Sequence, residues 1–354
     1  MPRAAPRGGD VTLYVGVDGG GSKTRVVAID DGGRRHLDDL LDGCDLPARG
    51  EAQVRRVLGE VRAAVTAAAA TAAAAGGAAG GATRGPARGG PAPAEVRLAL
   101  GLPAYGETAR WDEALDRLAA EAFTGWRYRV YNDVRLALEG ALPEGPGVLV
   151  LCGTGSMAWG KDHAGAEARC GGWGPLFGDE GSGFDLGMHA LRAACRVSDG
   201  RGPETRLHAD VPRALGVSDM HAVLASLSDT PAIPRARVAS LAREVVAAAE
   251  AGDAVAARLV EAAARELVDL VDGLRARLAL GRDVAVSTAG GLFASAGLTT
   301  AFRAELAARG YRPPTPPRHP PAVGGALLAG LKAGALGDAP DDARDEGPDD
   351  PPAA

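Results

Sequence analysis

Residues 14–24, with the sequence YVGVDGGGSKT, place one carboxylate, three consecutive glycines, a serine, a lysine and a threonine beside a β-branched run. A similar apolar run follows, and such runs on both sides of a glycine-rich turn predict a β-hairpin. Glycines leave backbone N–H groups uncovered, so an anion can approach the main chain closely at the tip. Asp18, at the end of the first run, can hold a magnesium-bound water beside such an anion. The pattern therefore indicates a hairpin that binds nucleotide phosphate with its metal ion.

Two better-known phosphate motifs do not fit this stretch. A P-loop needs glycine directly before lysine and a helix after it, whereas Ser22 separates Gly21 from Lys23. A dinucleotide fingerprint needs a third Gly or Ala that opens a helix, whereas Thr24 stands there and a strand follows. The alternative that stays open is a hairpin whose glycines serve only the turn.

A second copy of the pattern occurs in residues 147–160. An apolar run of six residues enters the turn Gly153-Thr154-Gly155-Ser156, and a short strand is expected to leave it. The G-x-G-x-x-A within it is a weak dinucleotide signal, because the residues after 158 form a turn rather than a helix. Two related hairpins, one in each half, predict a duplicated fold with phosphates held from both sides of a cleft.

Two further stretches carry candidate chemistry. Asp133 follows an expected strand over 128–131 and precedes an expected helix over 134–141, so it is either a general base or the N-cap of that helix. Residues 170–183 hold six glycines in fourteen positions, together with Trp173 and the acidic pair Asp179-Glu180. This setting favours hydroxyl recognition by the acids over a solvated acidic turn, whereas an indole is more often a core or lid residue than a platform for a sugar face.

The composition sets the class of protein. At 354 residues the chain is long enough for two domains, and a net charge of −6 gives no support to binding of nucleic acid or anionic membranes. The four cysteines form neither a Cys-x-x-Cys pair nor a zinc spacing, and scattered thiols indicate a reducing compartment. No apolar run reaches about 18 residues free of charge and glycine, so we expect no membrane-spanning helix and a cytoplasmic protein.

Strands and helices alternate along the chain, which predicts an α/β fold in layers. We expect a disordered leader (1–10), an N-terminal lobe (11–142), a C-terminal lobe (143–336) and a disordered acidic tail (337–354). Within the first lobe, the Ala/Gly/Pro-rich residues 72–94 are expected to form a flexible insertion. Helices are expected over 51–75, 111–123, 134–141, 184–196, 217–226, 237–251, 253–280, 299–308 and 322–335.

Five ordered blocks, VGVDGGGSKT, YND, VLCGTGS, GGWGPLFGDEGSG and AGGLFAS, resemble those of the N-acetylglucosamine kinase and BadF-type (BadF/BadG/BcrA/BcrD) ATPase family. This family lies within the sugar kinase/chaperone/actin superfamily, and the resemblance covers residues 14–332. It implies a two-lobed actin-like ATPase fold of the ribonuclease H-like type, with a nucleotide cleft between duplicated domains. It also implies ATP and Mg²⁺ as cofactors, a sugar substrate, and a homodimer as a possible assembly.

The resemblance implies a role for each matching residue. The residues expected to bind phosphate are Gly19, Gly20, Gly21, Ser22, Lys23 and Thr24, with Asp18 toward the metal, and Gly153, Thr154, Gly155 and Ser156. A solvated hairpin lysine is the alternative for Lys23. The residues expected at the adenosine end are Gly252, Gly290, Gly291 and Ser295. Asp133 matches the general base, and Gly172, Trp173 and Asp179, with the adjacent Glu180, match the sugar-contacting segment.

One position departs from the family pattern and affects specificity. Relatives usually carry an asparagine that reaches the sugar in the loop after the third strand, and Asp45 stands in the matching loop. A carboxylate only accepts hydrogen bonds, so it favours a donor-rich or cationic amino group. The leading interpretation is an ATP-dependent kinase of N-acetylglucosamine or a related hexosamine. The alternatives are the ATPase activator of a radical acyl-CoA dehydratase, which needs cluster-binding cysteines, and a non-catalytic nucleotide-binding regulator.

Overall fold

The computed structural model describes residues 11–79, 94–228 and 234–336, and it divides them into two compact units. The first unit contains residues 11–144 and 318–336, and the second contains residues 145–317. Residues 318–336 therefore belong to the first unit, whereas the sequence analysis assigned them to the C-terminal lobe. The expected leader 1–10, the expected tail 337–354 and most of the expected insertion lie outside the described residues.

The first unit is built on a five-stranded mixed sheet with the order β3-β2-β1-β4-β5. Its strands are β1 (Thr12–Gly19), β2 (Lys23–Asp30), β3 (Arg35–Asp42), β4 (Glu95–Leu102) and β5 (Arg127–Asn132). β1 pairs antiparallel with β2 and parallel with β4, so the chain makes a hairpin first and then returns by helical crossovers. The run Leu13–Val17 is buried throughout because helices cover both faces of the central strands.

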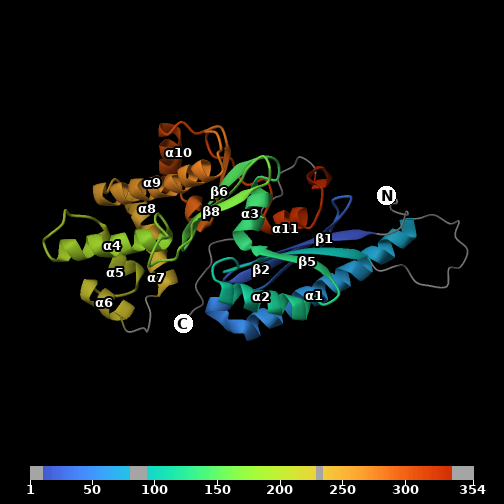
Figure 1. Ribbon diagram of the computed structural model, residues 1–354. Helices are drawn as coiled ribbons and strands as arrows, with labels where there is room; N and C mark the ends of the chain where they lie inside the picture. The colour runs from blue at the N-terminus through green and yellow to red at the C-terminus, as the bar shows by residue number, and fades with distance from the viewer. Residues whose placement is uncertain (1–10, 80–93, 229–233, 337–354) are drawn as a thin grey trace, which may run out of the picture. The chain divides into compact units, whose positions relative to one another are not determined.

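Helices cover the two faces of this sheet separately (Figure 1). α1 (Leu46–Ala79) and α2 (Ala109–Ala122) pack on one face, around a core that includes Val15 and Val17. α3 (Asp133–Ala141) and α11 (Pro321–Leu328) lie on the other face. α11 approaches the sheet closely, because a Cβ on Gly16 would lie 1.8 Å from the carbonyl oxygen of Ala322. This close contact explains the small residues of α11. The unit ends with the short 3₁₀ helix η2 (Ala333–Leu336).

α1 differs from its expected bounds at both ends. It extends through residues 72–79, which were expected to begin a flexible insertion, and Gly50 interrupts its first turns with φ +77°. By length and composition alone, residues 46–75 could cross a membrane, contrary to the expectation from the sequence. The core helix of a soluble protein meets the same criterion, and α1 buries Val57, Leu58 and Val61 completely in the unit's core.

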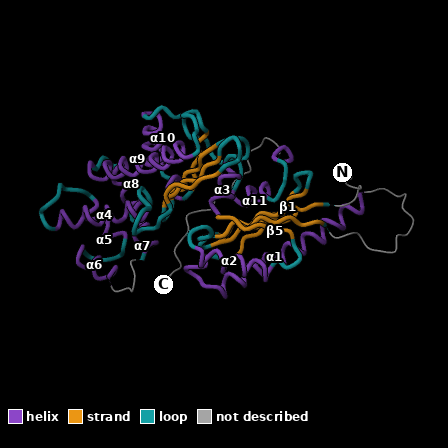
Figure 2. Tube along the Cα trace, in the orientation of Figure 1, coloured by secondary structure: helices purple, strands orange, loops and turns teal. Residues whose placement is uncertain are grey.

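The second unit has a four-stranded mixed sheet with the order β8-β7-β6-β9, shown in orange in Figure 2. Its strands are β6 (Gly147–Cys152), β7 (Ser156–Lys161), β8 (Glu167–Gly171) and β9 (Ala285–Ala289). Its helices are α4 (Gly183–Ser198), α5 (Leu207–Ala214), α6 (Met220–Ser228), α7 (Arg235–Ser240), α8 (Ala242–Glu250), α9 (Ala254–Arg277), the short 3₁₀ helix η1 (Gly291–Ala294) and α10 (Ala296–Ala308). As in the first unit, an antiparallel hairpin, here β6–β7, adjoins a parallel pairing, here β6–β9.

Candidate functional site

The first glycine-rich hairpin has the geometry that the sequence predicts. β1 and β2 pair up to Gly19 opposite Thr24, and the tip closes through a 2.8 Å hydrogen bond from the Gly20 N–H to the Lys23 carbonyl. Gly21 and Ser22 are exposed at the tip, and a Cβ on Gly21 would meet no atom within 4 Å. The backbone at Gly21 is therefore open to a ligand. Lys23 is also exposed.

The loop after β3 holds this tip in place. The Cys44 N–H donates to the Gly20 carbonyl at 3.1 Å, and the Arg49 side chain donates to the Gly21 carbonyl at 2.7 Å. Thr24 is completely buried, and its hydroxyl donates to the Asp42 carbonyl at 2.8 Å. The expected contact of the Thr24 side chain with nucleotide is therefore not supported, because this hydroxyl serves to fix the loop that supports the tip.

Asp133 lies at the junction of β5 and α3. The preceding Asn132 is the N-cap of α3: its side-chain oxygen accepts the Val134 N–H at 3.0 Å and its amide donates to the Tyr105 carbonyl at 2.8 Å. The Asp133 carboxylate also accepts the Val134 N–H, at 2.9 Å. Because the capping position belongs to Asn132, capping does not account for a carboxylate at position 133. The buried Asn132 fixes the backbone from which that carboxylate projects.

Burial and neighbouring acids perturb this carboxylate. Desolvation raises the pKa of Asp133 to about 6, and the charges of Glu107 and Asp45 act in the same direction. The Cys44 thiol lies in the same surroundings: burial raises its pKa to about 11, and the charges of Asp18, Asp133 and Asp45 contribute. Asp18, Asp45 and Asp133 therefore share one neighbourhood, next to the carboxyl ends of β1 and β5. Crevices at this end of parallel strands are common ligand sites in α/β sheets.

The carboxylates at this edge of the sheet fit a magnesium site only if phosphate and water supply the remaining ligands. Among the described residues, no group of three or more His, Cys, Asp or Glu side chains is arranged to hold a metal ion. Magnesium is commonly bound through one or two carboxylates plus substrate phosphates and water. Asp18, directly before the glycine tip, suits that kind of site, which forms only with the phosphate present.

The second hairpin is closed by contacts within its own unit. The Gly153 N–H donates to the Gly155 carbonyl at 2.9 Å, and the Thr154 and Gly153 carbonyls accept N–H groups from the start of α4. Ser156 is buried, and its hydroxyl donates to the Glu180 carbonyl at 2.7 Å. The Ser156 side chain is therefore used internally, whereas a Cβ on Gly153 would meet no atom within 4 Å.

Asp179 is bonded to this hairpin. Its carboxylate accepts the Ser156 N–H at 3.3 Å and an Arg235 N–H at 2.7 Å, and it lies 2.9 Å from the position of a Cβ on Gly155. The residue is 4% exposed and has φ +62°, and desolvation raises the pKa of its carboxyl. In this structure Asp179 bonds directly to the second hairpin and is itself paired with Arg235, a role that the sequence analysis did not assign to either residue.

The glycine-rich segment before Asp179 presents apolar side chains to solvent. Trp173 is 67% exposed, and the Arg169 guanidinium lies 5.4 Å from the centroid of its ring. Gly172 has φ +71° and packs against the Met157 side chain, which a Cβ would contact at 2.6 Å. Glu180 is exposed. Trp173 and Glu180 are therefore accessible to a ligand, as the sequence analysis requires.

The four residues expected at the adenosine end have different surroundings. Gly252 ends α8 with φ +89°, and its N–H donates to the Ala249 carbonyl at 2.9 Å. Gly290 has φ +99°, and a Cβ there would lie 2.3 Å from the Cys152 carbonyl oxygen, whereas Gly291 has open space. The Ser295 hydroxyl donates to the Leu292 carbonyl at 2.9 Å. Gly290 and Ser295 therefore have structural duties, whereas a Cβ on Gly252 or Gly291 would meet no atom within 4 Å, so a ligand can approach these two positions.

Sequence reasoning did not single out Asn132, Cys44, Arg49 or Arg235. A signal existed only for Asn132, which stands between a strand and a helix where an N-cap is common. Cys44 and Arg49 bond to the first hairpin tip and Arg235 bonds to Asp179, and no local pattern marks them because these partners are distant in sequence.

Each of the two α/β units has a mixed sheet whose first two strands form a glycine-rich β-hairpin. Two such units define the actin-like ATPase fold. A sequence profile of the BadF/BadG/BcrA/BcrD ATPase family matches residues 15–329, and the chain belongs to this family.

Similar proteins and a similar solved structure carry the names of amino-sugar kinases. The chain is 38% identical over 164 residues to an N-acetylmuramic acid/N-acetylglucosamine kinase of Clostridium acetobutylicum, a match that covers 46% of this chain and about half (53%) of that relative. It is 26% identical over 286 residues to an N-acetyl-D-glucosamine kinase of Dictyostelium discoideum, covering 77% of this chain and 82% of the relative. A crystal structure from Chromobacterium violaceum, provisionally assigned as an N-acetylglucosamine kinase, aligns with TM-score 0.68 and 26% identity over 90% of this chain and 99% of its own.

Proposed function

We propose that this protein is an ATP-dependent sugar kinase that phosphorylates a hydroxyl of N-acetylglucosamine or a related hexosamine. The observation that carries the proposal is Asp133, whose carboxyl has a pKa of about 6 at the end of β5, in the unit that holds the first glycine hairpin. A carboxyl with this pKa is ionised at neutral pH and still basic enough to accept a proton from an alcohol in the transition state. The names of the relatives support the same reaction class.

Phosphoryl transfer depends on positioning and charge neutralisation more than on covalent chemistry. We propose that the backbone at the exposed Gly21 and Thr154 binds phosphate oxygens, and that Gly291 lies against the nucleoside. Asp18 would hold magnesium through the phosphates, where the ion would supply charge neutralisation. Asp133 orients the sugar hydroxyl and takes its proton, and Asn132 fixes the direction of that carboxylate.

We infer the amino-sugar preference from Asp45. Its charge contributes to the pKa of Asp133, so the two carboxylates lie near each other. A hexosamine that places a hydroxyl at Asp133 would place a neighbouring amide or amino N–H toward Asp45, which can only accept. An amide N–H or an ammonium group can donate to the Asp45 carboxylate, and an ammonium group also brings an opposite charge that the hydroxyl of a simple hexose lacks. We expect this reaction in the cytoplasm.

A panel of sugars tests the proposal. The full chain with ATP and Mg²⁺ is incubated with N-acetylglucosamine, N-acetylmuramic acid, glucosamine and glucose, and ADP release and product phosphorylation are followed. We expect turnover with the amino sugars, loss of turnover in Asp133→Asn, and a preference over glucose that decreases in Asp45→Asn. Equal, slow ATP turnover with and without every sugar would contradict a kinase. Iron in anaerobically purified protein would instead support the dehydratase activator.

A further inference from the structure

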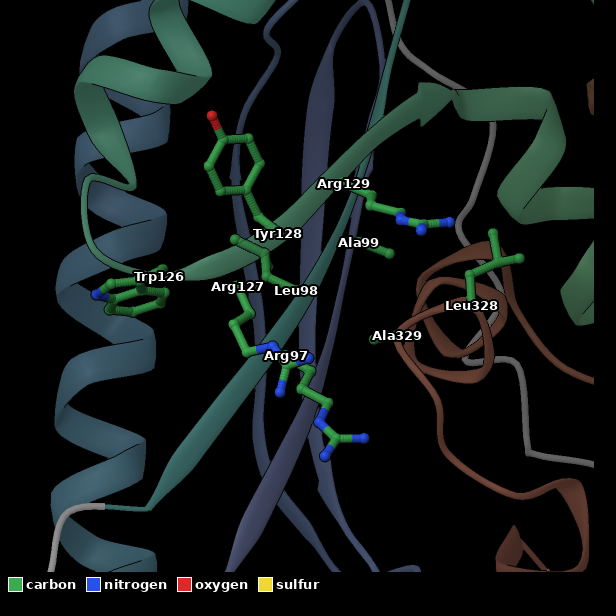
Figure 3. A pocket seen from close by; sticks show the side chains of 9 residues that line it. All are labelled: Arg97, Leu98, Ala99, Trp126, Arg127, Tyr128, Arg129, Leu328 and Ala329. Carbon is green, nitrogen blue, oxygen red and sulfur yellow. The ribbon is translucent and has the colours of Figure 1, made fainter. Parts of the chain in front are cut away.

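A groove lined by arginines lies on the first unit, away from Asp133. It is a cavity of about 450 Å³ on the sheet face that carries α11. Arg97 pairs with Arg127 and Ala99 with Arg129 across β4 and β5, so all four side chains are on one face. Leu328 and Ala329, at the end of α11, form the opposite wall (Figure 3). We call this cavity the arginine groove.

The arginine groove holds more positive charge than its carboxylates neutralise. Arg97 and Arg127 donate to the same oxygen of Glu95, at 3.1 and 3.0 Å. The Glu95 hydrogen bond raises the pKa of Arg97, and the nearby Tyr14 and Asp31 contribute less. Arg129 is exposed, and its guanidinium makes no hydrogen bond or ion pair with any residue in 11–79, 94–228 or 234–336. Like charges directly opposite on neighbouring strands are unfavourable, and Glu95 joins the Arg97–Arg127 pair, whereas Arg129 lies opposite Ala99.

The described part of the chain ends on the same sheet face as this groove, next to Gly33 in the β2–β3 turn. Leu336, the last residue of η2, packs against the apolar cluster that contains Tyr14. The Arg97 guanidinium lies over the Tyr14 ring at 5.7 Å, so this cluster adjoins the groove directly. Ala329, which lines the groove, packs against the same cluster. The residues after Leu336 therefore start on the sheet face that carries the groove, at its β2–β3 side.

The residues that follow have the complementary charge. Positions 337–354 contain seven acidic residues and one arginine, Arg344, and are rich in proline. Eighteen residues in extended form reach up to ~60 Å, so length does not restrict where they bind. A segment tethered to the same unit binds at a high effective concentration, which favours it over a free anion of the same charge.

We propose that the acidic C-terminal segment 337–354 binds in the arginine groove of its own chain, with its carboxylates on Arg97, Arg127 and Arg129. The groove lies toward the amino-terminal halves of β4 and β5, whereas Asp133 follows the carboxyl end of β5. The bound segment therefore leaves Asp133 uncovered and fastens the end of α11 to the sheet. The inference concerns a different surface from the proposed kinase site and is independent of it.

Carbodiimide coupling of lysine amines to carboxylates tests this proposal in the full chain. The chain has only three lysines, Lys23, Lys161 and Lys332, so a lysine introduced in the groove gives a distinct cross-linked peptide. We expect the Arg129→Lys variant to join position 129 to an acid within 337–354, at least ~5-fold more than the matched variant Arg110→Lys joins position 110. Coupling should decrease severalfold between about 0.05 M and about 0.5 M NaCl, because the pairs are exposed.

Any one of three outcomes would overturn the proposal. Equal coupling in Arg129→Lys and Arg110→Lys would show that the segment has no preference for the groove. Coupling only between isotopically heavy and light chains in a mixed sample would show that the segment binds a second copy instead. Thermal unfolding gives a separate readout. Replacing the seven acids of 337–354 by Asn and Gln should lower the thermal midpoint. This decrease should largely disappear in a chain that also carries Arg97→Gln, Arg127→Gln and Arg129→Gln, and it should persist in a chain that carries Arg34→Gln, Arg110→Gln and Arg192→Gln. If inorganic pyrophosphate stabilises the unaltered chain as much as the neutralised one, the groove takes a free anion and the proposal fails.

Discussion

Replacement of Asp133 by asparagine is expected to abolish phosphorylation and at the same time to stabilise the fold. Burial raises the pKa of this carboxyl from 3.8 to about 6. A shift of about two units corresponds to ~3 kcal/mol between the two protonation states. Asp133 is also the first residue of α3, where a negative charge gains ~0.5–1 kcal/mol from the helix N-terminus. The net gain expected for the neutral Asp133→Asn variant is therefore about 2 kcal/mol at high pH.

The sign of this effect depends on pH. Because the folded-state pKa lies above the unfolded value of 3.8, the contribution of Asp133 to stability is fully present below that pH. It is lost as pH rises toward 6, where the folded carboxyl ionises at a cost. The stability difference between Asp133→Asn and the unaltered chain should thus be small at about pH 4, grow as pH rises to about 6, and stay constant at about pH 8.

Denaturant unfolding at several pH values measures this stability difference. Sugar-dependent ADP release is measured for the same proteins at the same pH values. Glu113→Gln, which neutralises an exposed acid on α2, is the matched control and should change neither quantity. In the unaltered enzyme kcat/KM should fall about tenfold per pH unit below about 6. An Asp133→Asn variant that is less stable than the unaltered chain at about pH 8 would refute the desolvation argument, and retained turnover would refute the role as base.

Four more predictions concern residues around Asp133, the second hairpin and the expected nucleotide site. Glu107→Gln removes a charge that raises the pKa of Asp133, so the acid limb of the pH profile of kcat/KM should move to lower pH. An acid limb at unchanged pH would mean that the two carboxylates do not interact in solution. Asp179→Ala leaves the buried Ser156 N–H and Arg235 without their partner and should lower the free energy of unfolding by ~1–3 kcal/mol, as measured with denaturant. Asp179→Asn should lower it less. A raised KM for the sugar with unchanged stability would instead indicate a direct sugar contact. Gly290→Ala should lower the thermal midpoint, at a cost of ~1–3 kcal/mol, because of its φ of +99° and the Cys152 carbonyl at 2.3 Å. Gly291→Ala should fold normally and weaken ATP binding in calorimetry, and normal ATP binding would exclude Gly291 from the nucleotide site.

The sequence predicted those parts of the fold that depend on local pattern. The hairpin of β1 and β2 follows from alternating runs around three glycines, and β6–β7 follows in the same way. α5 was not predicted because it is short and contains Pro212, a residue that pattern reading takes as a helix break. β8 was not predicted because EARCG has neither β-branched residues nor clear alternation. α11 was placed in the wrong unit, because sequence order alone gives no sign that the chain returns to the first sheet.

The position of the candidate base in the sequence could be predicted, but the neighbouring charges that set its pKa could not. A strand followed by Asp133 and a helix is visible locally, whereas Glu107 and Asp45, which raise its pKa, are distant in sequence. The pairing of Asp179 with Arg235 joins residues 56 positions apart, so a reading of the acidic pair could not find it. Interactions of this kind become visible only when the elements that carry them are placed in space.

The glycines show what the structure adds to a motif. In the sequence, Gly19 and Gly21 are equivalent members of one triplet, and Gly290 and Gly291 are equivalent members of a pair. In the structure a Cβ on Gly19 would lie 2.5 Å from the Cys44 sulfur, and one on Gly290 would meet backbone, whereas Gly21 and Gly291 have open space. One member of each set is a glycine because the protein packs against it. The other has no such reason within the described residues, and the close approach of a ligand to the main chain is a physical cause that would account for it.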